Sequence, residues 1–320
     1  MSTAKIMDDF TDGLDEINLA EHGRAPEDER GAAIKDTMSS AYDLAALGSD
    51  PGDLWNWGMH DPEVVREIEA LIPHFDKFST DGFSEQLYFQ ALRGIPVPLE
   101  EFAGRSVLEV GCGIGGGLNF VSRCVPGADL VGLDVSPRAV QRATAQYARG
   151  SSLRFVVGDA EALPFDDGAF DAVINVESAH TYPNLGGFLA EVRRVLKPGG
   201  HFSMVDLFTE QRAGQLAAAR KSPAVEGLEW VQELDISAQV RAAIRRRMAP
   251  GSRLRATVAG KRMSPLARRV AEHSRITILG GQFAGYRDSG LITLLRKAGV
   301  LPSKQVLPVK SYVHHVATKA

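Results

Sequence analysis

The stretch Ser106-Val107-Leu108-Glu109-Val110-Gly111-Cys112-Gly113-Ile114-Gly115-Gly116-Gly117 decides the fold of this chain. Its apolar first half predicts a buried strand, and glycines 111, 113 and 116 then satisfy the spacing G-x-G-x-x-G. Glycine lets the backbone approach a ligand without a Cβ clash. This turn alone fits NAD, FAD or S-adenosylmethionine, so the residues around it must decide between them.

Apolar strand-like and helix-like segments alternate from this stretch onward, which indicates a parallel sheet with helices on both faces. Strands are expected at 106–110, 130–133, 153–157, 170–175 and 201–206, with helices at 116–124, 137–148 and 185–196. Lys197-Pro198-Gly199-Gly200 ends the last of these helices. A helix at 289–298 and strands near 305–309 and 312–318 would complete an α/β, Rossmann-like sheet of seven strands.

The regions outside this alternation predict two helical additions. Residues 1–95 are expected to form an N-terminal tail and helical lid, in which residues 1–35 are a loose tail or a short docking helix. The core, with the glycine turn, takes residues 96–208 and 286–320. Residues 209–285 interrupt the alternation and predict a helical substrate cap.

Composition narrows the class of protein. Hydrophobic residues make up 44% and charged residues 24% of the chain, as in soluble globular proteins. No apolar run is long enough for a membrane span, and the N-terminus lacks the order of a signal peptide, so we expect a cytoplasmic protein. Cys112 and Cys124 have neither metal spacing nor a disulfide pattern, so we expect two thiols and no metal.

The charge distribution leaves one question open. A total of 36 basic and 40 acidic side chains gives a net charge of −4, which is not typical of a nucleic-acid-binding protein. Residues 209–285, however, hold 14 Lys and Arg against 6 Asp and Glu, including Arg245-Arg246-Arg247. Solvated helix faces explain most such runs, and an anionic partner is the alternative.

Polar residues follow the predicted strands at the edge where open α/β sheets bind ligands. Asp134 ends the second strand, about twenty residues after the glycine turn, where a carboxylate can accept hydrogen bonds from ribose hydroxyls. Asp159 ends the third strand, near the expected adenine amine, and Asn175 and Glu177 end the fourth. Asp134 could instead cap the helix that begins at Ser136-Pro137, and Asp159 could order a loop.

With these residues the sequence resembles the class I S-adenosylmethionine-dependent methyltransferases. Residues 108–116 are similar to the first motif of that family, 158–165 to its adenine loop, 170–173 to its fourth strand and 195–200 to the turn before its fifth strand. Residues 174–183, Ile-Asn-Val-Glu-Ser-Ala-His-Thr-Tyr-Pro, resemble the phthiotriol and phenolphthiotriol dimycocerosate methyltransferases and the sterol, tocopherol and macrolide methyltransferases. The close resemblance covers about residues 104–208.

The resemblance implies S-adenosyl-L-methionine as the cofactor and S-adenosyl-L-homocysteine as its product. The cofactor-binding residues that we expect are Gln86, Glu109, Gly111, Cys112, Gly113, Asp134, Val135, Asp159, Ala160 and Asn175. Among them, Gln86 matches a glutamine before the sheet that holds the methionine carboxylate of the cofactor.

Candidates for the acceptor side of the reaction come from the loop after the fourth strand. His180 is our candidate base, because its usual pKa suits proton transfer near neutral pH. Tyr182 is a second catalytic candidate that could hydrogen-bond the acceptor, and Glu177 could orient either residue. Trp55 and Trp57 could close over the sulfonium or stack on an acceptor ring, although core packing explains such a pair equally well.

The resemblance implies methyl transfer to a small-molecule natural-product acceptor, with oxygen the first choice of acceptor atom. A nucleophilic carbon, such as an enol or an electron-rich aromatic ring like indole, is the alternative. Two further classes of protein stay open. One is a cyclase that keeps the fold without methylating. The other is a methyltransferase for RNA or protein, which the absence of an Asn/Asp-Pro-Pro-Tyr/Phe motif disfavours. We expect no nucleic-acid partner, and a homodimer is the oligomer that we consider.

Overall fold

The computed structural model describes residues 3–19, 29–49, 54–75, 80–260, 262–298 and 307–320. Its centre is a mixed sheet that, in these residues, has seven strands in the order β3-β2-β1-β4-β5-β7-β6. The strands are β1 (Ser106–Val110), β2 (Asp129–Asp134), β3 (Leu153–Val157), β4 (Phe170–Val176), β5 (Leu196–Phe208), β6 (Leu228–Asp235) and β7 (Ser311–Lys319). The predicted α/β fold with a Rossmann-like sheet of seven strands is confirmed.

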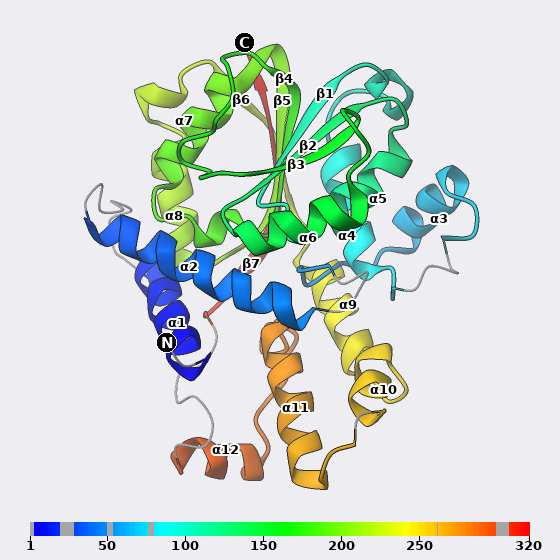
Figure 1. The fold of residues 1–320 in the computed structure, drawn as a ribbon, viewed down its shortest axis with the longest axis vertical. Helices are drawn as coiled ribbons and strands as arrows, with labels where there is room; N and C mark the ends of the chain where they lie inside the picture. The colour runs from blue at the N-terminus through cyan, green and yellow to red at the C-terminus, as the bar shows by residue number, and fades with distance from the viewer. Residues whose placement is uncertain (1–2, 20–28, 50–53, 76–79, 261, 299–306) are drawn as a thin grey trace.

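Strands β1 to β5 are parallel, whereas β7 runs antiparallel to both β5 and β6. The carboxyl ends of the parallel strands therefore meet at one edge of the sheet, which is the lower edge in Figure 1. β5 begins at Leu196, earlier than the sequence predicts, because Leu196 pairs with Phe170 before a shift in register.

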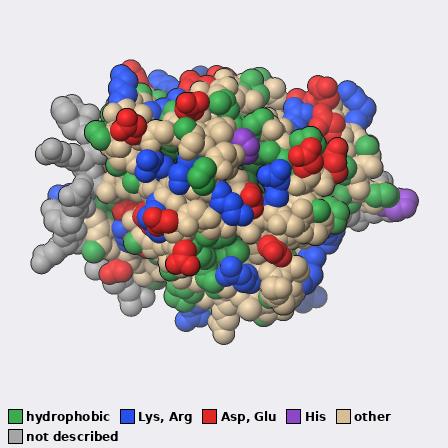
Figure 2. All heavy atoms as spheres, turned by 90° about the horizontal axis from the view of Figure 1, so that it is seen from above, with side chains coloured by type: hydrophobic (Ala, Val, Ile, Leu, Met, Phe, Trp, Pro, Cys, Tyr) green, Lys and Arg blue, Asp and Glu red, His purple; other side chains and the backbone are tan. Residues whose placement is uncertain are grey.

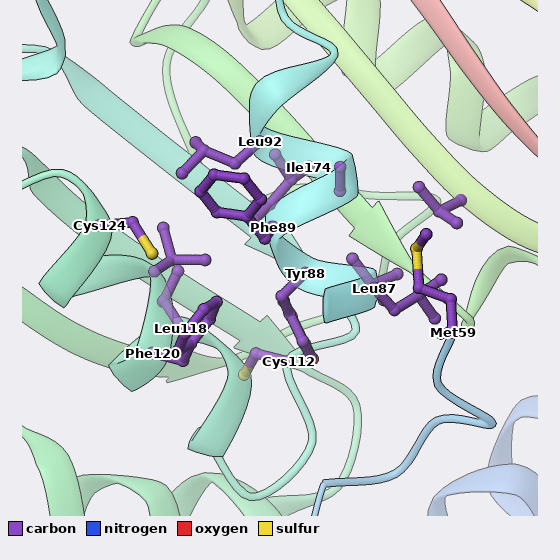
Figure 3. Close-up of a cluster of buried hydrophobic side chains, with 14 of the residues drawn as sticks. Met59, Leu87, Tyr88, Phe89, Leu92, Cys112, Leu118, Phe120, Cys124 and Ile174 are labelled. Atoms are coloured by element: carbon purple, nitrogen blue, oxygen red, sulfur yellow. The ribbon is translucent and has the colours of Figure 1, made fainter. Parts of the chain in front are cut away.

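Helices cover both faces of the sheet (Figure 1). Side chains of α4 (Phe83–Arg93) and α5 (Gly116–Cys124) share one core cluster with β1 and β4, and α6 (Pro137–Tyr147) completes this layer. Figure 3 shows Tyr88 and Phe89 of α4 between the sheet and α5. Side chains of α7 (Leu185–Val195) and α8 (Glu210–Ala219) build the second cluster on the other face.

Local sequence explains where several of these helices begin. Ser136 accepts a hydrogen bond from the amide of Ala139 and is followed by Pro137 in the first turn of α6, so the helix starts with a cap and a preset backbone angle. Asp61 caps α3 (Pro62–Leu71) in the same way. Asn184 caps α7 by accepting from the amide of Gly187.

The N-terminal segment is more ordered than the prediction of a loose tail. Residues of α1 (Thr3–Leu19) and α2 (Glu29–Gly48) form two contacting helices below the carboxyl edge of the sheet (Figure 1). Ile17 of α1 packs with Ile34 and Met38 of α2 in a small apolar cluster of its own. The helical periodicity of apolar residues is weak in this segment, because such a small cluster requires few apolar positions per helix.

The region predicted to be a helical cap contains a strand of the sheet, which corrects that prediction. β6 (Leu228–Asp235) is the outer strand beside β7, and the chain enters α9 (Ser237–Met248), α10 (Arg253–Ala259) and α11 (Pro265–Ile278) only after it. The strand expected at 305–309 lies partly outside the described residues, and residues 307–310 are not in a strand. The expected helix near 289–298 is α12 (Gly290–Lys297).

The opposite end of the molecule carries no dominant charge. Figure 2 shows acidic and basic side chains interspersed over the face that lies at the amino ends of the parallel strands. A search of the described helices for one long and apolar enough to cross a membrane finds none.

Candidate active site

A cavity lies at the carboxyl edge of the sheet, next to the glycine turn. Its walls come from this turn, from the ends of β2 and β3, from the loop after β4 and from helix α2. The lining includes Lys35, Met38, Tyr42, Trp55, Gly111, Cys112, Gly113, Asp134, Val135, Asp159, Ala160, Glu177, Ser178, Thr181 and Tyr182. Segments that are distant in sequence therefore meet around one cavity.

The glycine turn needs its glycines for both conformation and space. Gly111 has a φ of 81° and Gly113 a φ of 52°, in the left-handed region that other residues rarely adopt. A Cβ atom on Gly111 would lie 2.3 Å from Ser178 Oγ. The turn is fixed from below because the carbonyl of Leu133 accepts hydrogen bonds from the amides of Gly111 and Cys112.

Asp134 is held by the turn that it faces. One of its carboxylate oxygens accepts from the amide of Gly113 at 2.8 Å and the other from the amide of Ser136 at 2.9 Å. Burial raises the pKa of this carboxyl, and the two amides oppose the rise. Each carboxylate oxygen retains a further lone pair, so hydroxyl donors in the cavity could also be accepted. Val135 follows in the cavity wall.

Asp159 and Ala160 form the wall beyond β3, and helix α2 covers them. Lys35 of α2 donates a hydrogen bond to Asp159 at 2.7 Å and lies 2.5 Å from Glu161. Burial lowers the pKa of Lys35, but the two carboxylates outweigh burial and raise it. Further along α2, Asp43 accepts a hydrogen bond from the Ser136 hydroxyl. The predicted adenine loop is therefore tied to the N-terminal helices.

Glu109 lies inside the sheet and is not part of the cavity wall, although the resemblance implied a role for it in cofactor binding. Burial raises the pKa of its carboxyl to about 8, and the neighbouring Tyr88 opposes the rise. Within the described part of the chain, neither oxygen has a hydrogen bond in good geometry. A buried carboxyl is costly, and Tyr88 offsets part of this cost.

Asn175 and Tyr182 meet below the glycine turn. Asn175 Nδ2 shares its two hydrogens among three acceptors, the carbonyl of Val110 at 3.0 Å, Ser178 Oγ at 2.8 Å and the Tyr182 hydroxyl at 3.1 Å. The Tyr182 hydroxyl and Ser178 Oγ are 2.9 Å apart. This group of side chains shapes the turn from behind, and Tyr182 and Ser178 also reach the cavity wall.

Gln86 does not reach the cavity wall. Its amide oxygen accepts from the amide of Asp61 at 2.9 Å, and its amide nitrogen donates to the carbonyl of Gly82 at 3.0 Å. These contacts hold the turn before α3, and the contact of Gln86 with the cofactor stays a prediction.

The two tryptophans have separate surroundings. Trp55 lines the cavity, stacks on Tyr42 with ring centroids 5.8 Å apart and lies close to Gly113. Trp57 is buried, packs against Phe283 and Tyr312 and donates its indole N–H to the carbonyl of Ile278. Only Trp55 is therefore located to meet a ligand, and Trp57 is a core residue.

Glu177 directly follows β4 and has a strained conformation, with a φ of 53°. One carboxylate oxygen accepts from the amide of Trp57 at 2.7 Å and from the Tyr312 hydroxyl. Desolvation raises the pKa of Glu177 to about 7, while these two donors and nearby His180 oppose the rise. The residue thus presents a carboxyl to the cavity that is close to its titration point at neutral pH.

His180 forms a dyad with a carboxylate that the sequence analysis missed. Its Nδ1 lies 2.8 Å from one oxygen of Asp206, and its backbone amide donates to the other at 3.0 Å. The imidazole is largely buried and lies in the loop whose neighbours line the cavity, but it is not itself part of the wall. The contact between Nδ1 and Asp206 favours the tautomer that carries its proton on Nδ1, so Nε2 is the basic nitrogen.

The loop that carries His180 is held by elements from both helical additions. Arg212 of α8 is almost fully buried and donates to the carbonyls of Ala179 and Tyr182, the latter at 2.9 Å. Asn18 of α1 donates to the carbonyl of His180 at 2.7 Å. Burial lowers the pKa of Arg212 to about 10, and Asp206 opposes the decrease. The backbone around His180 is therefore fixed from two sides.

Some of the missed residues had a sequence signal. Asp206 ends the fifth predicted strand, so the rule that selected Asp134 and Asp159 at earlier strand ends would have selected it too. Lys35, Asn18 and Arg212 had no comparable signal, because only the packing of distant helices brings them to this edge.

Comparisons with known proteins agree with this geometry. Residues 108–204 match the model of the family described as "Methyltransferase domain". The chain is 34% identical to the phthiotriol/phenolphthiotriol dimycocerosates methyltransferase of Mycobacterium leprae over 245 residues, which are 76% of this chain and 83% of that protein. It is 42% identical to the fatty-acid O-methyltransferase of Mycolicibacterium smegmatis over 135 residues, 42% of this chain and 47% of that one.

Solved structures share the architecture at low identity. The [4+2]-cyclase SpnF is 18% identical with a TM-score of 0.55, over 89% of this chain and 96% of that one. A geranyl diphosphate methyltransferase solved with geranyl diphosphate and sinefungin is 16% identical with a TM-score of 0.55, over 90% and 100%. At such identity these similarities support the fold alone.

The chain belongs to the class I S-adenosylmethionine-dependent methyltransferases. Within that class it is related to the phthiotriol/phenolphthiotriol dimycocerosates methyltransferases. It is thus an enzyme that transfers a methyl group from S-adenosylmethionine to a small molecule.

The cavity fits this cofactor on structural grounds as well. The backbone of Gly111 and Gly113 lines the cavity, and Asp134 presents a carboxylate beside it. Apolar groups such as Leu133 and Ala160 complete the wall between the two carboxylates. An adenosine moiety needs hydrogen-bond acceptors for its ribose hydroxyls, an acceptor for its adenine amine and an apolar slot for its ring.

Proposed function

We propose that this enzyme methylates a hydroxyl oxygen of a lipid-like natural product, with His180 as the base. The preference for oxygen and for a lipid-like acceptor comes from the relatives, which are named for phthiotriol dimycocerosates and for fatty-acid O-methylation. The observation that carries the assignment of the base is the 2.8 Å contact between His180 Nδ1 and Asp206. A carboxylate at Nδ1 orients an imidazole and stabilises it once it is protonated.

We assign the cofactor to the cavity at the glycine turn. Gly111, Cys112 and Gly113 would approach it through backbone, Asp134 and Val135 would hold its ribose, and Asp159 and Ala160 its adenine. Glu109 and Asn175 would act from below, through the strand and the turn. When bound, S-adenosylmethionine supplies an electrophilic methyl group on a positively charged sulfur.

His180 would take the proton of the acceptor hydroxyl at Nε2 while Asp206 retains its contact with Nδ1. Removal of this proton makes the oxygen a stronger nucleophile, which matters because an alcohol is largely protonated at neutral pH. Glu177 and Tyr182 would orient the acceptor or the imidazole, and Trp55 would lie over the reacting groups. The rest of catalysis is positioning and exclusion of water.

We further propose that the helical additions enclose the reaction. Helices α1 and α2 would act as a lid, since α2 contributes Lys35, Met38 and Tyr42 to the cavity wall. The region 209–285 would act as a substrate cap, apart from the strand β6 that belongs to the sheet. A homodimer stays a prediction.

The test is methyl transfer from labelled S-adenosylmethionine to a panel of long-chain alcohols, fatty acids, phenols and indoles, followed by location of the new methyl group. We expect a methyl ether on a hydroxyl of an acceptor with a long alkyl chain, whereas a methyl ester would mean a carboxylate acceptor that needs no base. A new carbon–carbon bond would replace O-methylation with C-methylation. Conversion of an acceptor without release of S-adenosylhomocysteine would identify a cyclase instead.

A further inference from the structure

The chain concentrates its positive charge in one short segment. Residues 241–275 hold ten arginines and Lys261 against a single carboxylate, Glu272, so this segment has a net charge of +10. The remaining 285 residues then have a net charge of −14, given −4 for the whole chain. The segment forms helices α9, α10 and α11.

These helices form one unit at the edge of the sheet where the active site lies. α9 contacts β7, and α10 contacts both α9 and α11. Figure 1 shows α10 and α11 extending below the carboxyl edge of the sheet, away from the layer of α4 and α5. Basic side chains of this unit are therefore presented on the side of the molecule that holds the cavity.

Some arginines of this unit have structural roles. Arg247 is buried and binds Asp81 through two nitrogens, at 2.7 and 2.8 Å, as well as the carbonyl of Trp57. Arg241 lies over the ring of Phe283, and Arg255 pairs with Glu272 at 3.4 Å. Internal structure therefore accounts for these three side chains.

A larger group of arginines is exposed: Arg245, Arg246, Arg253, Arg262 and Arg269. α11, which carries Arg269, also exposes one apolar side chain near each of its ends: Leu266 is 50% and Ile278 67% accessible. A basic helical surface with exposed leucine and isoleucine is the combination that binds the interface of an anionic membrane, where arginines meet phosphates and apolar side chains enter the headgroup region. We call the five arginines, Leu266 and Ile278 the basic arm.

We propose that the basic arm docks the enzyme on an anionic lipid surface. The charge complementarity is local, since the rest of the chain is acidic and would be repelled by such a surface. Exposed leucine and isoleucine favour a lipid surface over RNA, whose binding sites combine basic groups with aromatic side chains that stack on bases. Docking through this arm would turn the cavity side of the enzyme toward the membrane, which would serve the lipid-like acceptor of the proposed function.

The experiment measures cosedimentation of the full-length enzyme with vesicles, without methyl transfer. Vesicles of phosphatidylcholine with one third phosphatidylglycerol are compared with vesicles of phosphatidylcholine alone. We expect binding only to the anionic vesicles, and weaker binding at higher salt. Because no turnover is measured, the outcome is independent of the acceptor and of the role of His180.

Variants make the test specific for the arm. Arg246→Glu with Arg269→Glu should weaken binding at least about tenfold, since each arginine adds several-fold to the affinity for an anionic surface. Arg66→Glu with Arg154→Glu makes the same change of charge at exposed positions on α3 and β3 and should have little effect. Leu266→Ser should weaken binding without any change in charge.

Three results would overturn the proposal. The first is no binding to anionic vesicles at low salt. The second is equal weakening by the two double variants, because this would reflect net charge and not the arm. The third is retention of an acidic protein or RNA by the arm while vesicles fail to bind, which would assign the surface to that class of partner.

Discussion

The proposed active site has a cofactor half and an acceptor half, and the two are built in different ways. The cofactor half consists of consecutive strand ends within residues 106–165, and each of its polar groups follows the strand that positions it. The acceptor half gathers α1, α2, β5, α8 and the loop after β4 around His180. The first half depends on local backbone geometry and the second on contacts between distant segments, so substitutions in the two halves should fail in different ways.

The largest effect is expected from the acceptor half, at the dyad. If His180 is the base as proposed, His180→Ala should lower kcat about 10³-fold and Asp206→Asn about 10²-fold, because the first removes the base and the second removes only its orientation and charge support. The dissociation constant for S-adenosylmethionine should change little in either variant. Single-turnover rates and cofactor titration measure the two quantities separately.

A rival base lies close by. Glu177 also presents a carboxyl to the cavity, and its pKa of about 7 suits proton transfer. Glu177→Gln keeps the volume and an oxygen that can accept from Trp57 and Tyr312, so we expect less than a tenfold loss of kcat. A loss as large as that of His180→Ala would make Glu177 the base.

The second effect tests the cofactor half. Gly111→Ala should weaken cofactor binding about 10²-fold, because its Cβ would meet Ser178 and its φ of 81° is strained for alanine. Gly199→Ala is the matched control, since Gly199 has a φ of 74° and open space around it. Calorimetric titration with S-adenosylhomocysteine and thermal unfolding distinguish the variants: both should lose stability, and only Gly111→Ala should lose the ligand.

The same contrast explains what the sequence could predict. The positions of β1 to β5, the glycine turn and Asp134 follow from local apolar runs, turn residues and spacing, and each of these is written in consecutive residues. β6 could not be found, because an exposed outer strand lacks the apolar run that marks a buried one. Lys35, Asn18 and Arg212 reach the site only through helix packing, which no local pattern encodes.

The third prediction concerns Arg212, the buried arginine that binds the loop of His180. Arg212→Lys keeps a positive charge but cannot reach the carbonyls of Ala179 and Tyr182 with the same fork of donors. We expect kcat to fall about tenfold with little change in the KM for S-adenosylmethionine, because a sub-ångström displacement of a base has effects of this size. Steady-state kinetics on fully folded protein measure both constants.

Arg247→Lys provides the control for Arg212→Lys. Arg247 is also buried and also binds a main-chain carbonyl, that of Trp57, but it supports the core next to α9 and not the loop of His180. Its variant should lower Tm while kcat per folded enzyme stays within about twofold. Equal losses of kcat in both variants would mean that Arg212 acts through general stability, and its role as a positioning residue would be withdrawn.

The smallest effect lies where the two halves meet, at the contact between α2 and the adenine loop. Lys35 pairs with Asp159 and Glu161 while partly exposed, and pairs of this kind contribute about 0.2–1 kcal/mol. If α2 is a lid that holds the cofactor in place, Lys35→Met should accelerate cofactor release by about threefold. Stopped-flow displacement of a fluorescent cofactor analogue measures this rate, and Lys221→Met, at an exposed position after α8, is the control.

Whether Lys35→Met speeds or slows cofactor release decides how the two halves of the site are coupled. In the lid interpretation, Lys35 stabilises the closed helix and its loss speeds release. In the opposite case, Lys35 occupies the carboxylate that the adenine amine needs, so its loss would free Asp159 and slow release. Slower release from Lys35→Met would therefore contradict the lid, and the pair would then be a contact that the cofactor must displace in order to bind.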